Sequence, residues 1–441
     1  MANFAKPQAP RFDLAVYQNE FLPEGGREVH AILTVTSSGG ATATRAADPG
    51  ATAVVIMVDC SGSMDYPPTK MAGARAATAA VLDTLRDGTE FAVVAGTHVA
   101  REVYPRGGRT AIADARTRAE AKDALRSLTA SGGTAIGTWL RLADRLLAAS
   151  GARIRHGVLL TDGRNEHEEP AALRAALEEC AGRFTCDARG VGTDWEVKEV
   201  TGIAEALLGT ADIVADPAHL AEDFTGMLRA VLEKDVADVA LRVWTPVNTE
   251  LVHLKQVAPT VVDLTDRRTE AGPRAGDHPT GSWGDEVRDY HLCVRVPEAG
   301  IGQEMLAARV SLVLPGSGSG TPPTVLSQGL VRAVWTEDVA MSTAINPQVA
   351  HYTGQAELAR VIRQGLEARK LGDIDGATAK LGRAVQLANV SGNEDTAKLL
   401  SKVVDVVDVE AGTVRLKAKV ADADEMTLET RSTKTVRVKR T

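Results

Sequence analysis

The chain has 441 residues, 44% of them hydrophobic, with a formal net charge of −8 at pH 7 and a pI near 5.7. This length allows about two to four domains, and the acidic balance argues against a nucleic-acid binder, which would carry a basic face. We find no signal-peptide pattern and no apolar run long enough to span a bilayer, so we expect a cytoplasmic protein without membrane insertion. The cysteines lack CxxC spacing, which predicts neither a zinc site nor a disulfide framework; they are Cys60, Cys180, Cys186 and Cys293.

Residues 51–232 alternate short apolar runs with stretches of helical periodicity. The run 53–58 is typical of a central parallel strand that is covered on both faces. Similar runs follow at 90–96, 156–163, 186–192 and 211–216. Helices are predicted between and after them, at 70–88, 119–131, 136–150, 170–182, 196–209 and 220–235. This alternation predicts a parallel sheet with helices on both faces, in which ligands bind at the carboxyl ends of the strands.

The segments on either side of this region alternate with the period of antiparallel strands. In 233–340, short alternating runs are separated by Pro- and Gly-rich turns, and residues 27–38 within 1–50 alternate in the same way. A single β-sandwich built from both flanks, with the α/β region inserted between its strands, would bury both sets of apolar faces.

Helical periodicity returns in the segment 341–410. Three helices are predicted there, over 349–373, 374–392 and 394–408, and they form a small bundle. The remaining residues, 411–441, become polar and basic, and we expect them to form a flexible tail.

Oxygen-bearing side chains follow the apolar run at 53–58. Asp59, Ser61 and Ser63 come directly after this predicted strand, Asp162 ends another strand, and Thr134 begins a predicted helix. Neighbouring parallel strands end at the same edge of a sheet, so these groups can converge. An all-oxygen set suits a hard divalent ion better than a transition metal.

These five residues resemble the metal-ion-dependent adhesion site (MIDAS) of von Willebrand factor type A (VWA) domains, and the likeness covers residues 51–232. The resemblance implies that Ser61 and Ser63 bind Mg²⁺ through their hydroxyls, while Asp59 and Asp162 act through waters and Thr134 joins when a ligand binds. Mn²⁺ and Ca²⁺ are the alternative ions. The expected fold class is α/β, with a Rossmann-like VWA domain inserted in an antiparallel β-sandwich and followed by a C-terminal helical bundle.

Neutral hydroxyl ligands leave the ion much of its positive charge, so a carboxylate from another protein can complete its coordination. We therefore interpret the chain as a non-catalytic protein-interaction scaffold that binds an Asp or Glu of a partner. Its layout resembles intracellular bacterial VWA proteins of signalling and stress response, associated with tellurite resistance, Ser/Thr kinases and phosphatases. The alternative is a VWA partner subunit of a MoxR- or chelatase-like AAA+ ATPase. Nucleotide hydrolysis would then belong to the ATPase, because this chain has no phosphate-binding GxxxxGK[ST] loop.

Two other interpretations of the stretch 59–63 stay open. It can be an ordinary strand-to-helix turn in which Ser and Asp cap the following helix. It can also hold an enzymatic aspartate or serine, but no glycine elbow or motif-marked histidine accompanies it, so we do not expect an enzyme. Cys60 is expected to be a buried structural thiol, His167 a solvated loop residue, and Asn165 and Glu166 part of the rim.

The end of the chain places hydroxyl residues among Arg and Lys. A solvated tail is the simplest interpretation, and a strand that adds to the sheet edge of a partner is a second one. The third is phosphorylation, with Thr433 and Thr435 as the acceptors. The tail is similar to threonine-containing ends that forkhead-associated domains bind in bacterial signalling proteins.

Overall fold

The computed structural model describes residues 11–38, 51–316 and 322–437. Contacts divide the chain into two compact units, residues 41–237 and residues 1–40 together with 238–441. The α/β region is therefore inserted between the first strands of the other unit and its remaining strands, as the fold class predicts. No helix among the described residues combines the length and the apolar character that crossing a membrane requires.

The α/β unit is built on one sheet with the strand order β10-β9-β8-β4-β5-β6, and β7 pairs with β5. Strands β4, β5, β8, β9 and β10 are parallel, and β6 and β7 run antiparallel to β5. The strands are β4 (Thr52–Asp59), β5 (Glu90–Gly96), β6 (Ala100–Tyr104), β7 (Ala111–Ile112), β8 (Ile154–Thr161), β9 (Thr185–Val191) and β10 (Ala211–Val214). The continuous apolar sequence of β4 fits its central place, where both of its faces are covered.

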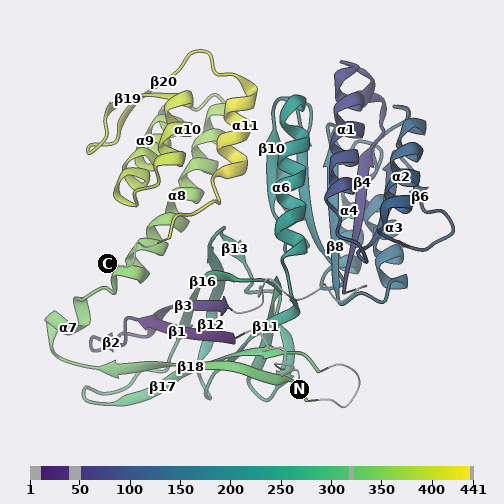
Figure 1. The fold of residues 1–441 in the computed structure, drawn as a ribbon. Coiled ribbons are helices and arrows are strands. Elements are labelled where there is room, and N and C mark those ends of the chain that lie inside the picture. The colour runs from purple at the N-terminus through teal and green to yellow at the C-terminus, as the bar shows by residue number, and fades with distance from the viewer. Residues whose placement is uncertain (1–10, 39–50, 317–321, 438–441) are drawn as a thin grey trace, which may run out of the picture. The chain divides into compact units, whose positions relative to one another are not determined.

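Helices cover this sheet in two groups (Figure 1). Helix α1 contacts α2 and α6, and α4 contacts α3 and α5. Their bounds are α1 (Thr69–Thr84), α2 (Ala115–Ala124), α3 (Ile136–Ala149), α4 (Pro170–Cys180), α5 (Val197–Ala206) and α6 (Leu220–Leu232). Short 3₁₀ turns are η1 (Gly62–Asp65), η2 (Leu125–Ser127) and η3 (Pro217–His219).

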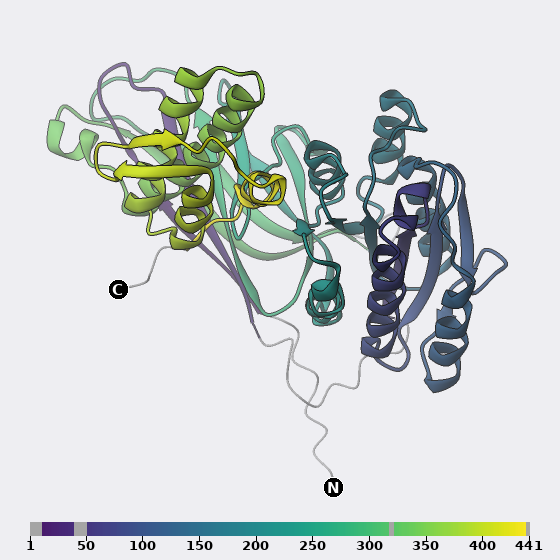
Figure 2. The same cartoon turned by 90° about the horizontal axis from the view of Figure 1, so that it is seen from above.

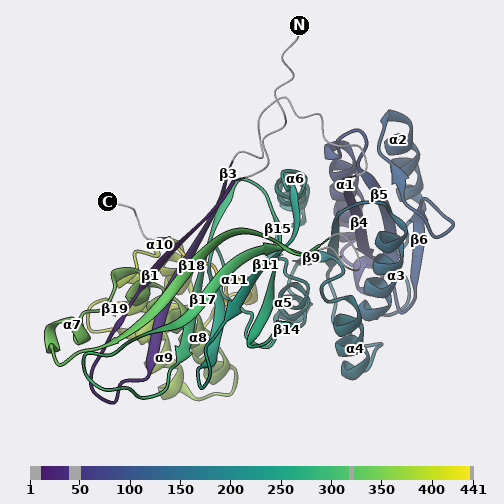
Figure 3. The ribbon, with the colours of Figure 1, turned by 90° about the horizontal axis from the view of Figure 1, so that it is seen from below.

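The second unit contains two further sheets, which form the predicted β-sandwich. One has the order β1-β3-β16-β12-β13 and the other β14-β15-β11-β17-β18-β2. The first comprises β1 (Arg11–Gln18), β3 (Glu28–Ser38), β12 (Glu250–Ala258), β13 (Val262–Asp263) and β16 (Glu286–Arg295). The second comprises β2 (Phe21–Leu22), β11 (Val236–Trp244), β14 (Thr269–Gly272), β15 (Ala275–Trp283), β17 (Glu304–Leu314) and β18 (Thr324–Trp335). Figure 3 shows the long strands β17 and β18 side by side.

The C-terminal part of this unit is mainly helical. Its elements are α7 (Val339–Thr343), α8 (Pro347–Lys370), α9 (Ile374–Val390), α10 (Glu394–Val403), β19 (Val404–Asp408), β20 (Thr413–Leu416) and α11 (Asp422–Arg431). The third predicted helix, 394–408, is wrong in its last turn, because residues 404–408 form a strand. The sequence "VDVVD" is rich in β-branched Val, which favours strands, and β19 pairs with β20 in a hairpin. Figure 2 shows this hairpin and α11 in yellow beside the other helices.

The expectation of a flexible tail over 411–441 is wrong for the part of it that the structure describes. Helix α11 places Leu428 in the helical core, and the residues after it lie along the sandwich. The Thr433 carbonyl accepts a hydrogen bond from Val261 N–H, and Thr435 N–H donates to the Pro259 carbonyl. Arg437 donates to the buried Asp289 through Nε and Nη2, at 2.9 and 2.7 Å. The polar sequence of this segment did not predict these contacts, because their partners are far away along the chain.

Candidate metal centre

The end of β4 and the end of β8 lie side by side at the carboxyl edge of the parallel sheet. The two strands pair in parallel from Thr52 to Val58 of β4, so Asp59, the last residue of β4, lies near Asp162, which directly follows β8. Both aspartates are completely buried, with 0% of each exposed. Buried carboxylates need hydrogen-bond donors or a cation, because an uncompensated charge is costly away from water.

Asp59 is held by its own turn and by the adjacent strand. Its Oδ1 accepts a 2.8 Å hydrogen bond from Ser61 N–H, and its Oδ2 accepts a 2.6 Å bond from the Thr161 hydroxyl. Burial raises the pKa of Asp59 to about 6, and these hydrogen bonds oppose the rise. Thr161 thus positions a candidate metal-site residue. Sequence reasoning missed it, although its place directly before Asp162 was the available signal.

Three hydroxyls converge beside Gly163. Ser61 Oγ and Ser63 Oγ lie 2.9 Å apart, and Ser63 Oγ donates to Asp162 Oδ1 at 2.7 Å. A Cβ atom on Gly163 would lie 3.0 Å from Ser63 Oγ, 3.5 Å from Thr134 Oγ1 and 3.8 Å from Ser61 Oγ. The structure therefore brings all five sequence-predicted residues to one edge of the sheet, with hydroxyl oxygens around a small space that a side chain at position 163 would fill.

The loop that carries Thr134 is anchored on two sides. Gly62 N–H donates to the Gly132 carbonyl at 2.9 Å, which joins the loop to the turn after β4. Thr134 N–H donates to His167 Nδ1 at 3.2 Å, and His167 N–H donates to the Thr134 carbonyl at 3.0 Å. Glycine is needed at position 133, where a Cβ would lie 2.1 Å from His167 Cγ. His167 is exposed, as expected of a loop residue, but it also fixes the position of Thr134.

Asn165 was predicted to lie in the rim of the site, and the structure gives it a supporting role in addition. It is buried, and its Oδ1 accepts a 2.8 Å hydrogen bond from Ile136 N–H at the start of α3. Its own N–H donates to Glu199 Oε2 at 3.1 Å. Asn165 therefore satisfies a free N–H of the first turn of α3, next to Thr134. Glu166, the other predicted rim residue, is exposed.

Lys70 is the residue of the site that sequence reasoning missed most plainly. It lies at the start of α1, is buried, and its Nζ is 2.7 Å from Asp162 Oδ2 and 2.8 Å from Asp194 Oδ2. Burial lowers the pKa of Lys70, but the two carboxylates outweigh burial and raise it overall. The ammonium group therefore compensates part of the negative charge of the site.

The donor set fits a small, hard divalent cation. Mg²⁺ has bonds of about 2.0–2.1 Å in octahedral geometry, which place neighbouring ligand oxygens about 2.9 Å apart. The Ser61 Oγ to Ser63 Oγ and Ser63 Oγ to Asp162 Oδ1 separations of 2.9 and 2.7 Å are close to this value. Cys60, between Asp59 and Ser61 in sequence, is the buried thiol that we expected, and burial raises its pKa to about 12.

This chain is similar in sequence and in structure to proteins of one family. A model of the von Willebrand factor type A domain matches residues 52–213, and a model of the von Willebrand factor type A C-terminal domain matches residues 386–432. The solved structure of "von Willebrand factor type A from Catenulispora acidiphila" is 51% identical, covers 98% of this chain and 99% of its own, and superposes with a TM-score of 0.92. This chain belongs to the von Willebrand factor type A family.

Two other proteins are more distantly similar to this VWA protein. The ArnB paralog VWA2 from Sulfolobus acidocaldarius is 13% identical over 96% of this chain and 98% of its own, with a TM-score of 0.58, so it shows a shared fold alone. An uncharacterized protein from Synechocystis, sll0103, is 27% identical over 216 residues. That match spans about half of the length of each protein, 48% of this chain and 49% of the relative.

Thr433 and Thr435, the predicted phosphoacceptors, belong to the other unit and are not part of this site. Both are partly exposed, and the Thr435 hydroxyl donates to the Val257 carbonyl at 2.6 Å. A kinase would have to release Thr435 from this hydrogen bond. Phosphorylation of either residue stays a prediction.

Proposed function

We propose that this VWA protein is a non-catalytic interaction module, which binds an Asp or Glu of a partner protein through one divalent cation. The cation, Mg²⁺ by the spacing of the oxygens, would be held by Ser61 and Ser63, with Asp59 and Asp162 acting through water and Thr134 joining the complex. The observation that carries the proposal is the convergence of three hydroxyl oxygens beside Gly163, next to two buried aspartates.

The chemistry of the side chains supports this role. Hydroxyls are neutral ligands, and the charge of Asp162 is shared with Lys70 Nζ at 2.7 Å. An ion bound here keeps a positive charge that its protein ligands do not cancel, and an oxygen ligand from outside can fill the remaining positions. A carboxylate is the side chain that supplies both a hard oxygen and a negative charge.

Metal binding is tested by calorimetric titration of MgCl₂ into EDTA-treated protein. We expect one site in the wild type and loss of binding in Ser63→Ala, whose hydroxyl lies 2.7 Å from Asp162 Oδ1. The matched control is Ser127→Ala, because Ser127 is exposed and its hydroxyl donates to the nearby Ala124 carbonyl, away from the proposed site. Equal binding by all three proteins would refute the site.

Carboxylate binding is tested on the Mn²⁺-loaded protein by water-proton relaxation. Bound Mn²⁺ that keeps open positions relaxes exchanging water, and acetate or a Glu-containing peptide should displace that water and lower the relaxation. Capture of native partners with Mg²⁺ present, and their release by EDTA and by Ser63→Ala, would then identify the protein that supplies the carboxylate. Partners that persist in EDTA and in the variant would contradict the proposal.

A further inference from the structure

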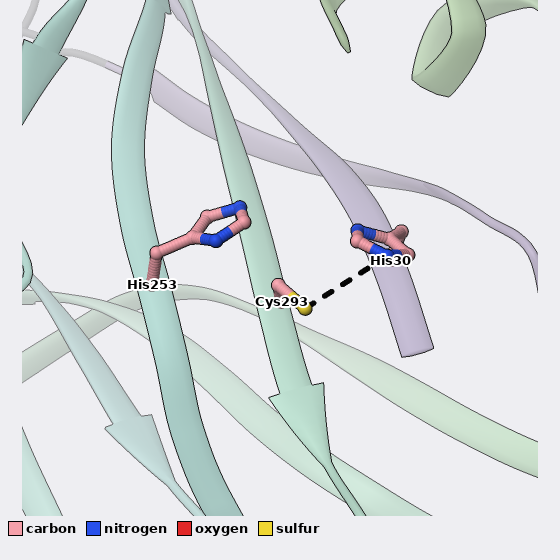
Figure 4. A group of neighbouring side chains, drawn as sticks. All are labelled: His30, His253 and Cys293. Atoms are coloured by element: carbon pink, nitrogen blue, oxygen red, sulfur yellow. Dashed lines mark hydrogen bonds between the residues drawn. The ribbon is translucent and has the colours of Figure 1, made fainter. Parts of the chain in front are cut away.

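A second group of metal-ligating side chains lies in the β-sandwich, outside the VWA domain. His30 on β3, His253 on β12 and Cys293 on β16 each offer one ligand atom, and these atoms all lie within 4.8 Å of one another. Figure 4 shows the Cys293 side chain on the middle strand, between the two imidazole rings. The group combines two nitrogen ligands with one sulfur ligand.

The strand register places the three residues in one row across the sheet. Cys293 pairs with His30 on one side and with His253 on the other. A β-bulge between Leu251 and His253 adds one residue to β12 just before this row. Without the bulge, His253 would pair with the fully buried Leu292 and would lie on the opposite face of the sheet. Bulges are frequent beside functional sites because they turn a side chain toward a new direction.

His291 gives His30 a defined orientation. His30 Nε2 is 3.9 Å from Cys293 Sγ, whereas His30 Nδ1 is 3.1 Å from His291 Nε2. The two ring nitrogens of His30 therefore face different groups. Histidines that bind metal usually donate their second ring N–H to a neighbouring acceptor, which fixes the tautomer and the ring. His291 Nε2 can be that acceptor for His30.

One ring nitrogen of His253 has no hydrogen-bond partner in the part of the chain that the structure describes. His253 Nε2 is buried, and no donor or acceptor among the described residues pairs with it. A buried polar atom of this kind is costly unless a ligand satisfies it.

We propose that His30, His253 and Cys293 bind one Zn²⁺ ion, with His291 as the positioning residue of His30 and water in the fourth coordination position. Two imidazoles and a thiolate suit a borderline-soft ion, whereas the VWA site offers only the oxygens that a hard ion prefers. Tetrahedral Zn²⁺ places its ligand atoms about 3.3–3.6 Å apart. The ligand atoms lie within 4.8 Å of one another, so side-chain rotations would have to bring the most distant pair closer by up to about 1.2–1.5 Å.

The ion would tie together parts of the chain that are far apart in sequence. His30 precedes the inserted VWA domain, and His253 and Cys293 follow it. Zn²⁺ would thus join β3 to β12 and β16, in addition to the backbone hydrogen bonds of the sheet. This proposal does not depend on the proposed function, because it concerns other residues in the other unit.

The first experiment uses Co²⁺ as a spectroscopic substitute for Zn²⁺, in the full-length Ser63→Ala protein so that the VWA site does not contribute. We expect one equivalent of Co²⁺ to give a thiolate-to-cobalt charge-transfer band and the strong visible bands of tetrahedral Co²⁺. One equivalent of Zn²⁺ should remove both. Cys293→Ser should lose the charge-transfer band, and His291→Phe should weaken metal binding by about 10- to 100-fold.

Matched variants separate metal binding from misfolding. Cys180→Ser removes another buried thiol, on α4, and should keep the full band. Zn²⁺ should also raise the thermal unfolding midpoint of the Ser63→Ala protein but not that of a Cys293→Ser/Ser63→Ala protein. A Co²⁺ spectrum without a charge-transfer band in folded protein, or a band that survives Cys293→Ser, would overturn the proposal.

Discussion

The contact between Lys70 and Asp162 leads to a prediction about the coupling of metal binding and stability. Lys70 Nζ is 2.7 Å from Asp162 Oδ2, and the two side chains are 7% and 0% exposed. Lys70→Met keeps most of the apolar stem and removes the charge. In the metal-free protein, Asp162 would then remain buried with the Ser63 hydroxyl as its remaining hydrogen-bond donor in the described structure.

The cost can be worked out from this environment. Removal of one partner of a buried ion pair lowers the free energy of unfolding by about 3–5 kcal/mol. Mg²⁺ bound beside Asp162 would supply positive charge in place of Lys70, and we take the recovered part as about half of this loss, about 2 kcal/mol. Because binding and stability are linked, the recovered free energy appears as tighter binding, and about 2 kcal/mol corresponds to roughly thirtyfold.

The assay combines urea unfolding, with EDTA and with saturating Mg²⁺, and calorimetric titration of Mg²⁺. Lys70→Met should be strongly destabilised in EDTA, less so in Mg²⁺, and should bind Mg²⁺ more tightly than the wild type. Lys122→Met is the matched control, since Lys122 pairs at 2.6 Å with Asp83 on the exposed surface. That change should cost less than about 1 kcal/mol and leave Mg²⁺ affinity unchanged. Weaker Mg²⁺ binding by Lys70→Met, or unchanged stability in EDTA, would refute the reasoning.

Three further predictions concern other contacts. Burial raises the pKa of Asp187, but His156 at 3.0 Å, Arg189 and Thr210 outweigh burial and lower the pKa overall. The folded pKa therefore lies below the unfolded value of about 3.9. The ionised Asp187 stabilises the fold at neutral pH, and this stabilisation begins to be lost as the pH falls below about 4. Asp187→Asn should therefore cost about 3–5 kcal/mol at pH 7 in denaturant unfolding and less near pH 3, where the stabilisation has begun to fall; an equal cost at both pH values would contradict this. Gly133→Ala should displace His167 and weaken Mg²⁺ binding by about 10-fold in calorimetry. Adding His167→Ala should remove the clash. A Gly133→Ala protein with wild-type affinity would disprove the role of the loop. Arg437→Ala should lower the free energy of unfolding of its unit by about 1.5–3 kcal/mol, because Asp289 is 2% exposed and loses its guanidinium partner. Chemical denaturation that shows no change would argue against docking of the chain end.

The sequence was sufficient where a pattern is local. The apolar run at 53–58 and the oxygen residues that follow it predicted both β4 and the edge at which Asp59, Ser61 and Ser63 lie. Contacts between distant segments were not predictable in this way. Lys70 reads as an ordinary residue at the start of a helix, and only the fold brings its Nζ to Asp162.

The same limit explains the outcome for the cysteines and the chain end. The spacing of Cys293 to other cysteines gave no indication of a metal site, because its neighbours are histidines on β3 and β12, 263 residues away for His30. The polar residues after Leu428 have the composition of a solvated tail. Their backbone groups nevertheless find partners at Pro259 and Val261, and Arg437 finds a buried carboxylate.

The insertion of the VWA domain also imposes an order on folding during synthesis. Strand β3 ends at Ser38, but its partner β16 begins at Glu286, so about 250 residues must be translated before the two can pair. At about 5–20 residues per second, β3 stays without that partner for roughly 12–50 s after it is made. The contiguous VWA domain can fold in this interval, while the apolar side chains of β3 wait for the strand that completes their sheet.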